Sequence, residues 1–398
     1  MKKSGTAKRR LQITMILYGS LPVDTRVLRE VRVLADAGYD VSVLDLDWGL
    51  EGFPSPRYVR RRSVLRMPFL QRISSIGLLR FWFACLKYLI RNRQSIDIVH
   101  AHDLTGLPPA FVISILCPRI KTVYDSHEIF PEAALDKLSL LHYVLFLGLE
   151  LICSTKVDWL FSVSPSCLRT LSSRIRAPSI LLLNVPDLNR VRSILGYIPQ
   201  WRGIRDDHLI KIVYPGAIST QRGYEQLPEA AQILDAIDEV EFQFIIVGDG
   251  PLLPELKRIV RDKGLEYRFA FTGRIGFDEM LLLMVDCDIA LALYEETWNN
   301  SSGLSNKLFE YMMVGIPFIF THLTQSMPIL EKVGAPTLKH PASGKDIADA
   351  ILSLHSNSAR MREISREGLR LIEGRFNWSK ESERLAKVYR EIHGAVFG

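Results

Sequence analysis

The segment SNKLFEYMMVGIPFIF, residues 305–320, places a helix start, a carboxylate, a helix stop and a buried strand in sequence order. Gly315, with a proline two residues later, is typical of a helix end. Free N–H groups at a helix N-terminus bind phosphate, and Ser305 or Asn306 can cap the same end. Glu310 lies about one turn further in, where it can accept hydrogen bonds from a sugar diol. The segment fits a nucleotide diphosphate site, and it fits a capped surface helix equally well.

Apolar strands alternate with helical segments in both halves of the 398-residue chain. This alternation indicates α/β architecture with parallel sheets covered on both faces. The expected strands are 11–18, 40–46, 97–101, 120–124, 159–163 and 180–183 in the first half, and 210–214, 242–247, 268–272, 289–293 and 317–320 in the second. The expected helices include 25–37, 224–237, 253–263, 277–285 and 306–314.

The length of the chain predicts two domains, and 47% hydrophobic residues give each enough apolar surface for a core. We expect two Rossmann-like domains facing across a cleft, the first at 1–190 and the second at 205–377. The polar stretch 186–208, which contains proline and glycine, is the expected linker. Ligands in such folds bind beyond the carboxyl ends of the strands, so the loops after the strands are the places to search.

Cysteine usage and the N-terminus indicate a cytoplasmic protein. The five cysteines are odd in number, far apart and in apolar surroundings, so neither disulfides nor zinc are expected. The basic N-terminus precedes a short apolar segment that is typical of a strand, and no signal peptide is expected.

The net charge of +6 is concentrated in one window. Residues 52–96 contain ten basic residues and no acidic one. Inside it, 76–90 is amphipathic, basic and too short to span a bilayer, which needs about 20 apolar residues. An anionic membrane surface explains the window, and so does a core helix under a solvated arginine loop. Nucleic acid is a third reading, but no nucleic-acid motif accompanies the arginines, so we expect no nucleic-acid partner.

Polar loops follow three strands of the first half. After the first strand, Gly19 permits close backbone approach, and Asp24 can simply cap the next helix ahead of Arg26. After the third comes His-Ala-His-Asp at 100–103, in which a histidine could bind a metal or, more plausibly, a substrate hydroxyl. After the fourth strand comes a polar run that could contact an acceptor or satisfy loop backbone; its candidate residues are Asp125, His127 and Glu128.

Four loops of the second half bring polar or basic groups to one edge of the expected sheet. The loop at 216–223 carries Arg222, whose planar fork suits a diphosphate. Glycine turns follow at 247–251 and 272–274, where the absence of side chains permits close approach to a ligand. The convergence of these loops predicts a binding site better than any one of them does.

These motifs, taken in order, resemble family 4 retaining glycosyltransferases of the GT-B fold. The resemblance covers about residues 11–390 and rests on Gly-x5-Arg-Gly at 216–223, Val-Gly-Asp-Gly-Pro at 247–251, Thr-Gly-Arg at 272–274 and Asn-Lys-Leu-Phe-Glu-Tyr-Met at 306–312. It implies sugar transfer from a nucleotide donor with retained configuration, without a metal or cofactor. It also implies that a last helix, 378–393, crosses back to the first domain.

The resemblance assigns roles to individual residues. Arg222 and Lys307 resemble the pair that neutralises the donor diphosphate, and His102 the histidine that contacts the transferred sugar. Glu310 resembles the carboxylate that holds the ribose. Other donor-side positions implied are Gly19, Gly216, Gly248, Asp249, Gly273, Arg274, Ser302, Ser305 and Asn306, and the acceptor-side positions are Asp24, Arg26, Asp125, His127 and Glu128.

Some positions depart from the family. A glutamate that is common eight residues before Glu310 is replaced by Ser302, and a basic residue common after Gly216 is Ala217. The donor sugar is therefore not predicted.

Three other classes of protein are compared with the glycosyltransferase interpretation. A nicotinamide oxidoreductase requires Gly-x-Gly-x-x-Gly directly after a strand, and no strand here has it. A sugar-nucleotide epimerase of the same fold and a noncatalytic membrane-associated scaffold are the alternatives. We expect a transferase acting on a lipid-linked or saccharide acceptor in bacterial surface polysaccharide or glycolipid assembly, held at the inner membrane face by its 57–93 region.

Overall fold

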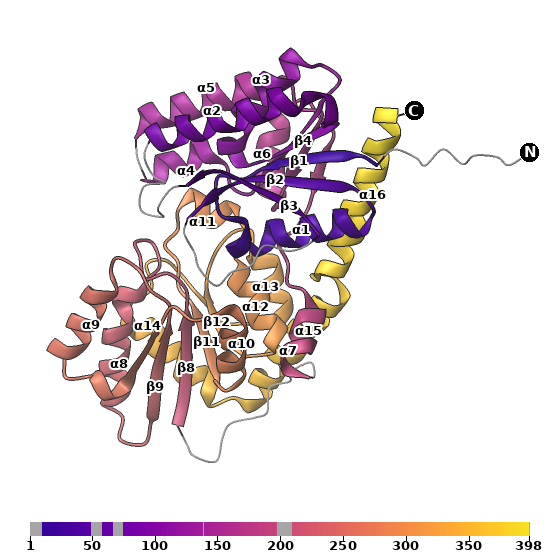
Figure 1. The fold of residues 1–398 in the computed structure, drawn as a ribbon. Helices are drawn as coiled ribbons and strands as arrows, with labels where there is room; N and C mark the ends of the chain where they lie inside the picture. Colours follow the sequence, from indigo (N-terminus) through magenta and orange to yellow (C-terminus); the bar gives the residue numbers. More distant parts are fainter. Residues whose placement is uncertain (1–9, 49–57, 67–74, 138, 197–208, 398) are drawn as a thin grey trace, which may run out of the picture. The chain divides into compact units, whose positions relative to one another are not determined.

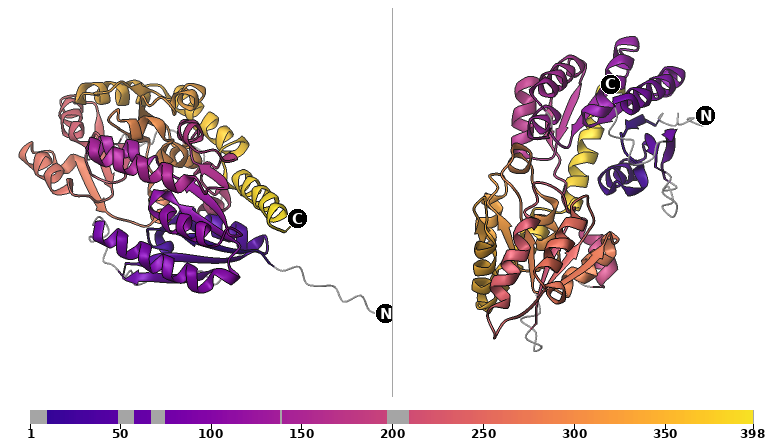
Figure 2. Two further views of the ribbon diagram at one scale, coloured as in Figure 1. Left: turned by 90° about the horizontal axis from the view of Figure 1, so that it is seen from above. Right: turned by 90° about the vertical axis from the view of Figure 1, so that its left-hand side faces the viewer.

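The structure is a computed structural model that describes residues 10–48, 58–66, 75–137, 139–196 and 209–397. The chain forms two compact units. One comprises Met1–Asn184 with Glu381–Gly398, and the other comprises Val185–Lys380. The sequence analysis expects the first boundary at 190–205. Helices cover both faces of the sheet in each unit (Figures 1 and 2).

The N-terminal unit contains a seven-stranded parallel sheet in the order β3-β2-β1-β4-β5-β6-β7. Its strands are β1 (Gln12–Ile16), β2 (Asp40–Asp47), β3 (Arg60–Arg66), β4 (Ile98–His102), β5 (Lys121–Ser126), β6 (Trp159–Ser162) and β7 (Ser179–Leu181). Its helices are α1 (Thr25–Asp36), α2 (Ser75–Asn92), α3 (Asp103–Leu116), α4 (Phe130–Lys137), α5 (Leu140–Ser154) and α6 (Pro165–Arg174). Two short 3-10 helices occupy Leu21–Val23 and Arg93–Ser95.

The C-terminal unit contains a six-stranded parallel sheet in the order β10-β9-β8-β11-β12-β13. Its strands are β8 (Leu209–Pro215), β9 (Glu241–Val247), β10 (Phe269–Gly273), β11 (Ile289–Ala292), β12 (Phe318–Thr321) and β13 (Thr337–Leu338). Its helices are α7 (Leu188–Leu195), α8 (Leu227–Asp235), α9 (Leu253–Asp262), α10 (Phe277–Val285), α11 (Trp298–Ser302), α12 (Asn306–Val314), α13 (Met327–Val333), α14 (Gly344–His355) and α15 (Ser358–Gly374). Short 3-10 helices occupy Tyr224–Gln226 and Glu266–Arg268.

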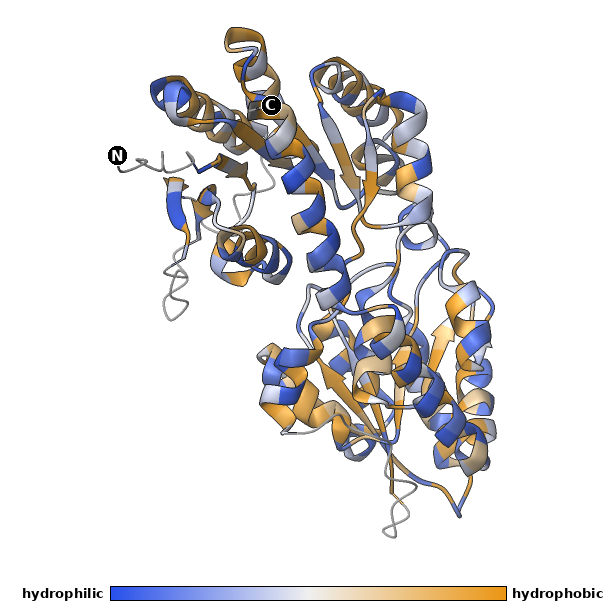
Figure 3. Cartoon of the chain, turned by 90° about the vertical axis from the view of Figure 1, so that its right-hand side faces the viewer, coloured by the Kyte–Doolittle hydropathy of each residue, from blue (hydrophilic) through white to orange (hydrophobic). Residues whose placement is uncertain are grey.

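Both sheets have the doubly wound strand order of the Rossmann fold, in which the order reverses at a switch point. The switch points lie between β1 and β4 and between β8 and β11. Their strands are largely hydrophobic, as continuous burial on both faces requires (Figure 3). The prediction of two Rossmann-like parallel sheets is confirmed.

The last helix, α16 (Trp378–Phe397), begins in the C-terminal unit and continues in the N-terminal unit from Glu381 onward. Glu381 is buried and accepts a hydrogen bond from the Leu183 amide at 3.0 Å. Further along, the Tyr389 hydroxyl lies 2.6 Å from Nδ1 of His100 on β4. The C-terminal segment therefore completes the packing of the N-terminal unit.

Three segments differ from the sequence predictions. The strands β3 and β13 were missed, because the sequence RRRSVLR of β3 offers little apolar alternation and β13 is only two residues long. The predicted linker contains α7, which Asp187 caps and which ends at Gly196 in a left-handed conformation. Residues 197–208 of that linker, and Arg57 and Arg72 of the basic window, lie outside the described residues.

Several arginines of the basic window form ion pairs with carboxylates of β2. Arg61 Nε lies 2.6 Å from Oδ2 of Asp45, whose side chain is fully buried. Arg60 pairs with Asp40 at 3.1 Å, and Arg66 with Asp47 at 3.8 Å. Arg61 is mostly buried, at 19% exposure of its side chain, whereas Arg60 and Arg66 remain exposed at 65% and 81%. Among the described residues, no helix is both long and apolar enough to cross a membrane.

We predict that Arg61→Ala destabilises the protein much more than Arg60→Ala. Arg61 is the cation beside a buried carboxylate, and breaking a buried pair costs about 3–5 kcal/mol. Arg60 is largely exposed, and a surface pair contributes about 0–1 kcal/mol. Urea unfolding of both variants measures the difference, and equal losses would show that the Asp45 pair does not hold β3.

Candidate functional site

Arg222 and Lys307 lie against one tyrosine at the switch point of the C-terminal sheet. Arg222 is on the loop after β8, and Tyr294 follows the neighbouring strand β11. The Arg222 Cζ lies 5.0 Å and the Lys307 Nζ 5.4 Å from the centre of the Tyr294 ring. Lys307 Nζ is also 3.3 Å from the tyrosine hydroxyl. Cation–π contacts of this kind hold both positive groups in one place. The sequence analysis had not singled out Tyr294.

The backbone around Arg222 is tightly constrained. Gln221 and Gly223, on either side of it, both have left-handed backbone, with φ of 67° and 63°. A non-glycine residue adopts this conformation at a cost, so the surroundings must enforce it. The Gln221 carbonyl accepts a hydrogen bond from the Glu295 amide at 3.2 Å, and the Tyr214 hydroxyl donates to the Arg222 carbonyl. The loop after β8 is thus fixed to the loop after β11.

Glycines 216 and 248 lie in tightly packed loops. A Cβ on Gly216 would lie 2.6 Å from Lys307 Nζ, and a Cβ on Gly248 would lie 2.0 Å from the Gly216 carbonyl oxygen. Both have positive φ, 131° and 142°. Hydrogen bonds run from Gly216 N to Val247 O and from Gly248 N to Gly273 O. These glycines allow the loops to pack against each other and let Lys307 lie over the backbone.

The N-terminus of α12 departs in one respect from its predicted form. Ser305 occupies the N-cap position, but its hydroxyl does not accept a bond from the helix amides. It lies 2.6 Å from the Tyr294 hydroxyl instead. The Ser305 hydroxyl therefore does not cap α12. Asn306 is exposed at the start of the helix, and Glu310 is half-buried about one turn further along.

Among the residues that the structure describes, neither Arg222 nor Lys307 forms an ion pair with a carboxylate. Two positive charges and the positive end of a helix are therefore gathered without a neutralising group. Such an arrangement is suited to a dianion, above all to a diphosphate.

The other predicted donor-side residues have varied surroundings. Asp249 is exposed, and its Oδ1 accepts a bond from the Gly250 amide at 2.7 Å. Arg274 is exposed after β10, and Ser302 is buried at the end of α11. Gly19 belongs to the N-terminal unit, where its carbonyl accepts a bond from the Leu46 amide at 2.8 Å.

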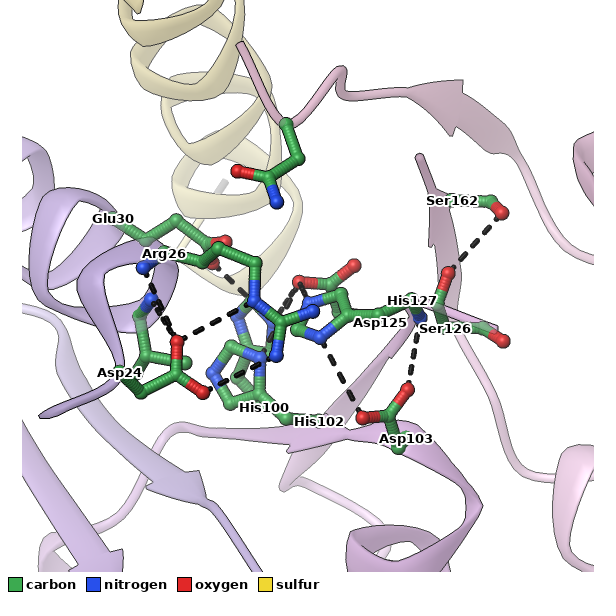
Figure 4. Close-up of polar contacts among 12 residues, drawn as sticks. Asp24, Arg26, Glu30, His100, His102, Asp103, Asp125, Ser126, His127 and Ser162 are labelled. Atoms are coloured by element: carbon green, nitrogen blue, oxygen red, sulfur yellow. Dashed lines mark hydrogen bonds and ion pairs between the residues drawn. The ribbon is translucent and has the colours of Figure 1, made fainter. Parts of the chain in front are cut away.

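A second polar cluster lies in the N-terminal unit, around the carboxylate of Asp125 (Figure 4). Asp125 is the second-last residue of β5, and its Oδ2 faces three histidines. His127 Nε2 lies at 3.0 Å, His102 Nδ1 at 3.4 Å and His100 Nε2 at 3.5 Å. The rings of His100 and His102 are stacked, with centres 4.4 Å apart. One carboxylate oxygen therefore faces three rings, two from β4 and one from the residue that follows β5.

The outer part of this cluster comes from α1 and α3. Asp24 caps α1 by accepting bonds from the Arg26 and Val27 amides, and its carboxylate pairs with the Arg26 guanidinium at 3.2 Å. Asp103 begins α3 with φ of 58° and accepts a bond from the His127 amide at 2.9 Å. About a third of the Arg26 side chain is exposed to solvent. These residues are the solvent-facing edge of a mostly buried network.

Charge and burial set the protonation of the cluster. Burial and Arg26 oppose a proton on His127, but Asp125 and Asp103 prevail and raise its pKa well above the usual value. Burial opposes the charge of Asp125, yet His127 and the three ring N–H groups lower its pKa well below the usual value. Burial and Asp125 together raise the pKa of Glu30 well above its usual value. Burial lowers the pKa of His100 to about 4.

The two histidines that the sequence analysis singled out are buried. It expects one of them to bind a substrate hydroxyl, and His100 and His102 are 0% and 1% exposed. Glu30 and Tyr389, which line the cluster, were missed because nothing local marks a helix residue that faces a strand far along the chain. Glu128 contributes its carbonyl, which accepts a bond from the Ser126 hydroxyl at 2.8 Å.

The cluster also contains the described residues best placed to hold a metal ion. Ligand atoms of Glu30, His102, Asp125 and His127 all lie within 4.8 Å of one another. A cation there would have to displace the His127 proton and tolerate the charge of Arg26, which acts on both His127 and Glu30. The proton on His127 and the guanidinium already supply the positive charge that the carboxylates need.

Comparison with known proteins gives consistent matches for both units. Residues 23–182 match glycosyltransferase family 4, and residues 210–357 match glycosyl transferases group 1. The chain is 25% identical over 335 residues to 2-deoxystreptamine glucosyltransferase from Streptomyces kanamyceticus, covering 74% of this chain and 79% of that one.

Solved structures with the same fold cover nearly the whole chain. WaaG, a glycosyltransferase involved in lipopolysaccharide biosynthesis, has a TM-score of 0.72 at 15% identity, covering 94% of this chain and 99% of that one. HepE from Anabaena, in complex with UDP-glucose, has a TM-score of 0.68 at 15% identity, covering 96% of this chain and all of that one. The fold is thus the one that glycosyltransferases of the GT-B type share.

We predict that the stability lost in His127→Gln depends on pH in a defined direction. The raised pKa means that the native state keeps a proton that the unfolded chain loses above about pH 6.5. The contribution of His127 is full below that pH and declines as the pH rises through the native pKa. The loss should be about 3–5 kcal/mol at pH 6, as for a broken buried pair, and smaller at pH 9 or above. Urea unfolding at both values tests this; an equal loss at both would mean that His127 is neutral in the native protein.

Proposed function

Because this chain belongs to the glycosyltransferases of family 4 and group 1, we propose that it transfers a sugar from a nucleoside-diphosphate sugar to an acceptor hydroxyl with retention of configuration. It is a glycosyltransferase with a GT-B fold. The observation that carries the donor assignment is the pair Arg222 and Lys307, both held on the ring of Tyr294. HepE, which shares the fold, binds UDP-glucose.

The proposed chemistry follows from where charge develops. Breaking the bond between the sugar and the diphosphate builds negative charge on the leaving phosphate oxygens. Arg222, Lys307 and the α12 amides stabilise that charge, and because they are already in place no reorganisation is needed. A divalent cation has this role in other transferases. We assign it here to these two side chains, so the reaction is metal-independent and needs no cofactor.

The acceptor hydroxyl forms the new bond to the anomeric carbon on the face from which the diphosphate departs. Its proton passes to an oxygen of the departing phosphate, so no covalent nucleophile of the chain is required. Glu310 holds the ribose hydroxyls, and Gly273 and Arg274 meet the base. His102 is assigned the contact with the transferred sugar through Nε2, which has no hydrogen-bond partner among the described residues. Since the ring is buried, that contact requires local opening.

The acceptor side of the proposal rests on the edge of the N-terminal cluster. Arg26 and Asp24 keep part of their surface accessible, and Asp103 does so too. We propose that these groups, with Asp125, His127 and Glu128 behind or beside them, bind a saccharide or lipid-linked acceptor at the cytoplasmic face of a bacterial membrane. Assembly of a surface polysaccharide or glycolipid is the process that fits such an acceptor, and WaaG takes part in lipopolysaccharide biosynthesis.

An epimerase of the same fold and a noncatalytic scaffold are not favoured. The relative from Streptomyces kanamyceticus is named as a transferase, and two cations that pair with no carboxylate among the described residues serve no evident structural purpose. Product analysis separates the enzymes, because an epimerase releases an altered sugar without any acceptor.

We predict that Arg222→Ala or Lys307→Ala lowers turnover by roughly 10²-fold or more, as for other groups that stabilise charge in a transition state. Arg261→Ala, which removes an exposed arginine of α9, is the matched control and should leave turnover unchanged. Release of the nucleoside diphosphate measures the rate. Full activity in both variants would remove the diphosphate assignment. Activity that is lost with a chelator and restored by magnesium would contradict the metal-independent part.

A further inference from the structure

The outer surface of the N-terminal unit exposes large apolar side chains on three adjacent helices. α3 packs against both α2 and α5, on the face of the sheet opposite α1 (Figure 1). Of the 17 large hydrophobic residues that are exposed in the described part of the chain, 12 belong to these helices. They are Ile76, Leu79, Phe83 and Ile90 on α2, Ile115 and Leu116 on α3, and Leu140, Leu141, Val144, Leu145, Leu151 and Ile152 on α5. We call this set the apolar face.

The exposure on α5 follows a helical stripe. Leu141, Val144, Leu145 and Ile152 are each more than half exposed, at 65%, 56%, 58% and 60%, while Glu150 and Cys153 face inward. The exposed positions recur at spacings of three, four and seven, so they lie on one side of the helix. A monomeric protein rarely leaves an apolar surface of this extent uncovered, and an extensive one marks an interaction site.

The charges around the apolar face are of one sign. In the described segments 75–119 and 139–156, the exposed ionised side chains are Arg80, Lys87, Arg91, Arg93, Arg119 and Lys156. No acidic side chain in those segments is exposed, since Asp97 and Glu150 are buried and Asp103 is partly buried in the polar cluster. Apolar side chains with a basic surround are the composition of a surface that lies in an anionic bilayer interface.

We propose that the apolar face, with α5 inserted and the basic residues of α2 against the headgroups, docks the enzyme on an anionic phospholipid membrane. This inference rests on the membrane location in the proposed function, but it places the contact on α2 and α5 and not on β3, where Arg60, Arg61 and Arg66 pair with carboxylates. Lys87 and Arg91 also line a shallow hollow on α2 with Phe83, Leu86 and Ile90, where a lipid phosphate could lie above apolar side chains.

Self-association is the main rival occupant. In a twofold dimer the same patch contacts itself, so the six basic side chains would meet the same six on the partner with no exposed carboxylate to neutralise them. An anionic membrane instead supplies the opposite charge, together with an apolar interior for α5.

Vesicle flotation with the full chain tests the proposal. Vesicles of phosphatidylcholine with a quarter phosphatidylglycerol should retain the protein at least tenfold better than phosphatidylcholine alone. The preference should weaken at high salt. Leu141→Asp with Leu145→Asp should lower the partition at least tenfold, whereas Leu282→Asp, an equally exposed leucine of α10 at 54%, should not. Arg80→Ser with Lys87→Ser should remove the preference for the anionic vesicles.

Hydrogen exchange on the unaltered protein is the second measurement, independent of any folding defect in a variant. Anionic vesicles should slow exchange in 140–154 and 75–92 and leave 277–285 unchanged. No retention by either vesicle, equal loss with Leu282→Asp, or a concentration-dependent dimer that Leu141→Asp dissociates would overturn the proposal. Transfer to a water-soluble acceptor requires no vesicle, so its presence or absence tests the proposed function separately.

Discussion

Both polar clusters depend on the reversal of strand order in a parallel sheet. Between β1 and β4, and between β8 and β11, the connecting helices leave toward opposite faces, so the carboxyl ends of those strands are not covered by their own connections. Arg222 and Tyr294 come from the strands of one such pair, and His102 ends a strand of the other. Polar groups placed elsewhere on these sheets would be covered by helices and would need internal partners.

The polar clusters of the two units differ in how their charges are neutralised. The N-terminal cluster brings carboxylates together and neutralises them internally, with Arg26 and with a proton that Asp103 and Asp125 hold on His127. The C-terminal cluster gathers Arg222 and Lys307 on an aromatic ring and leaves them without a carboxylate among the described residues. A network that is already neutralised keeps its geometry without a ligand, whereas gathered cations favour an anionic one. This contrast is why the donor is assigned to the C-terminal unit.

The sequence predicts the sheets well because buried parallel strands are nearly continuous apolar runs. It fails where tertiary contacts override local pattern. β3 is held at the sheet edge by Arg61 and Asp45, a pair that no periodicity reveals, and α7 lies where proline and glycine suggested only a linker. At the site, Arg222 and Lys307 were predicted from motifs, but Tyr294, which holds both, was not. His102 is buried beside His100 and Asp125. The two-residue spacing between the histidines in the sequence does not indicate this burial.

The proposal that most needs a test is that the C-terminal unit recognises a diphosphate through fixed cations. Calorimetric titration of the full chain tests this most directly. The ligands are UDP, GDP, ADP and dTDP, and the affinity of each is compared with that of its monophosphate in the presence of EDTA. The account predicts that at least one diphosphate binds tenfold or more tightly than the matching monophosphate, with affinity falling as salt rises. Equal binding of every pair, or a difference that exists only after magnesium is added, would contradict it.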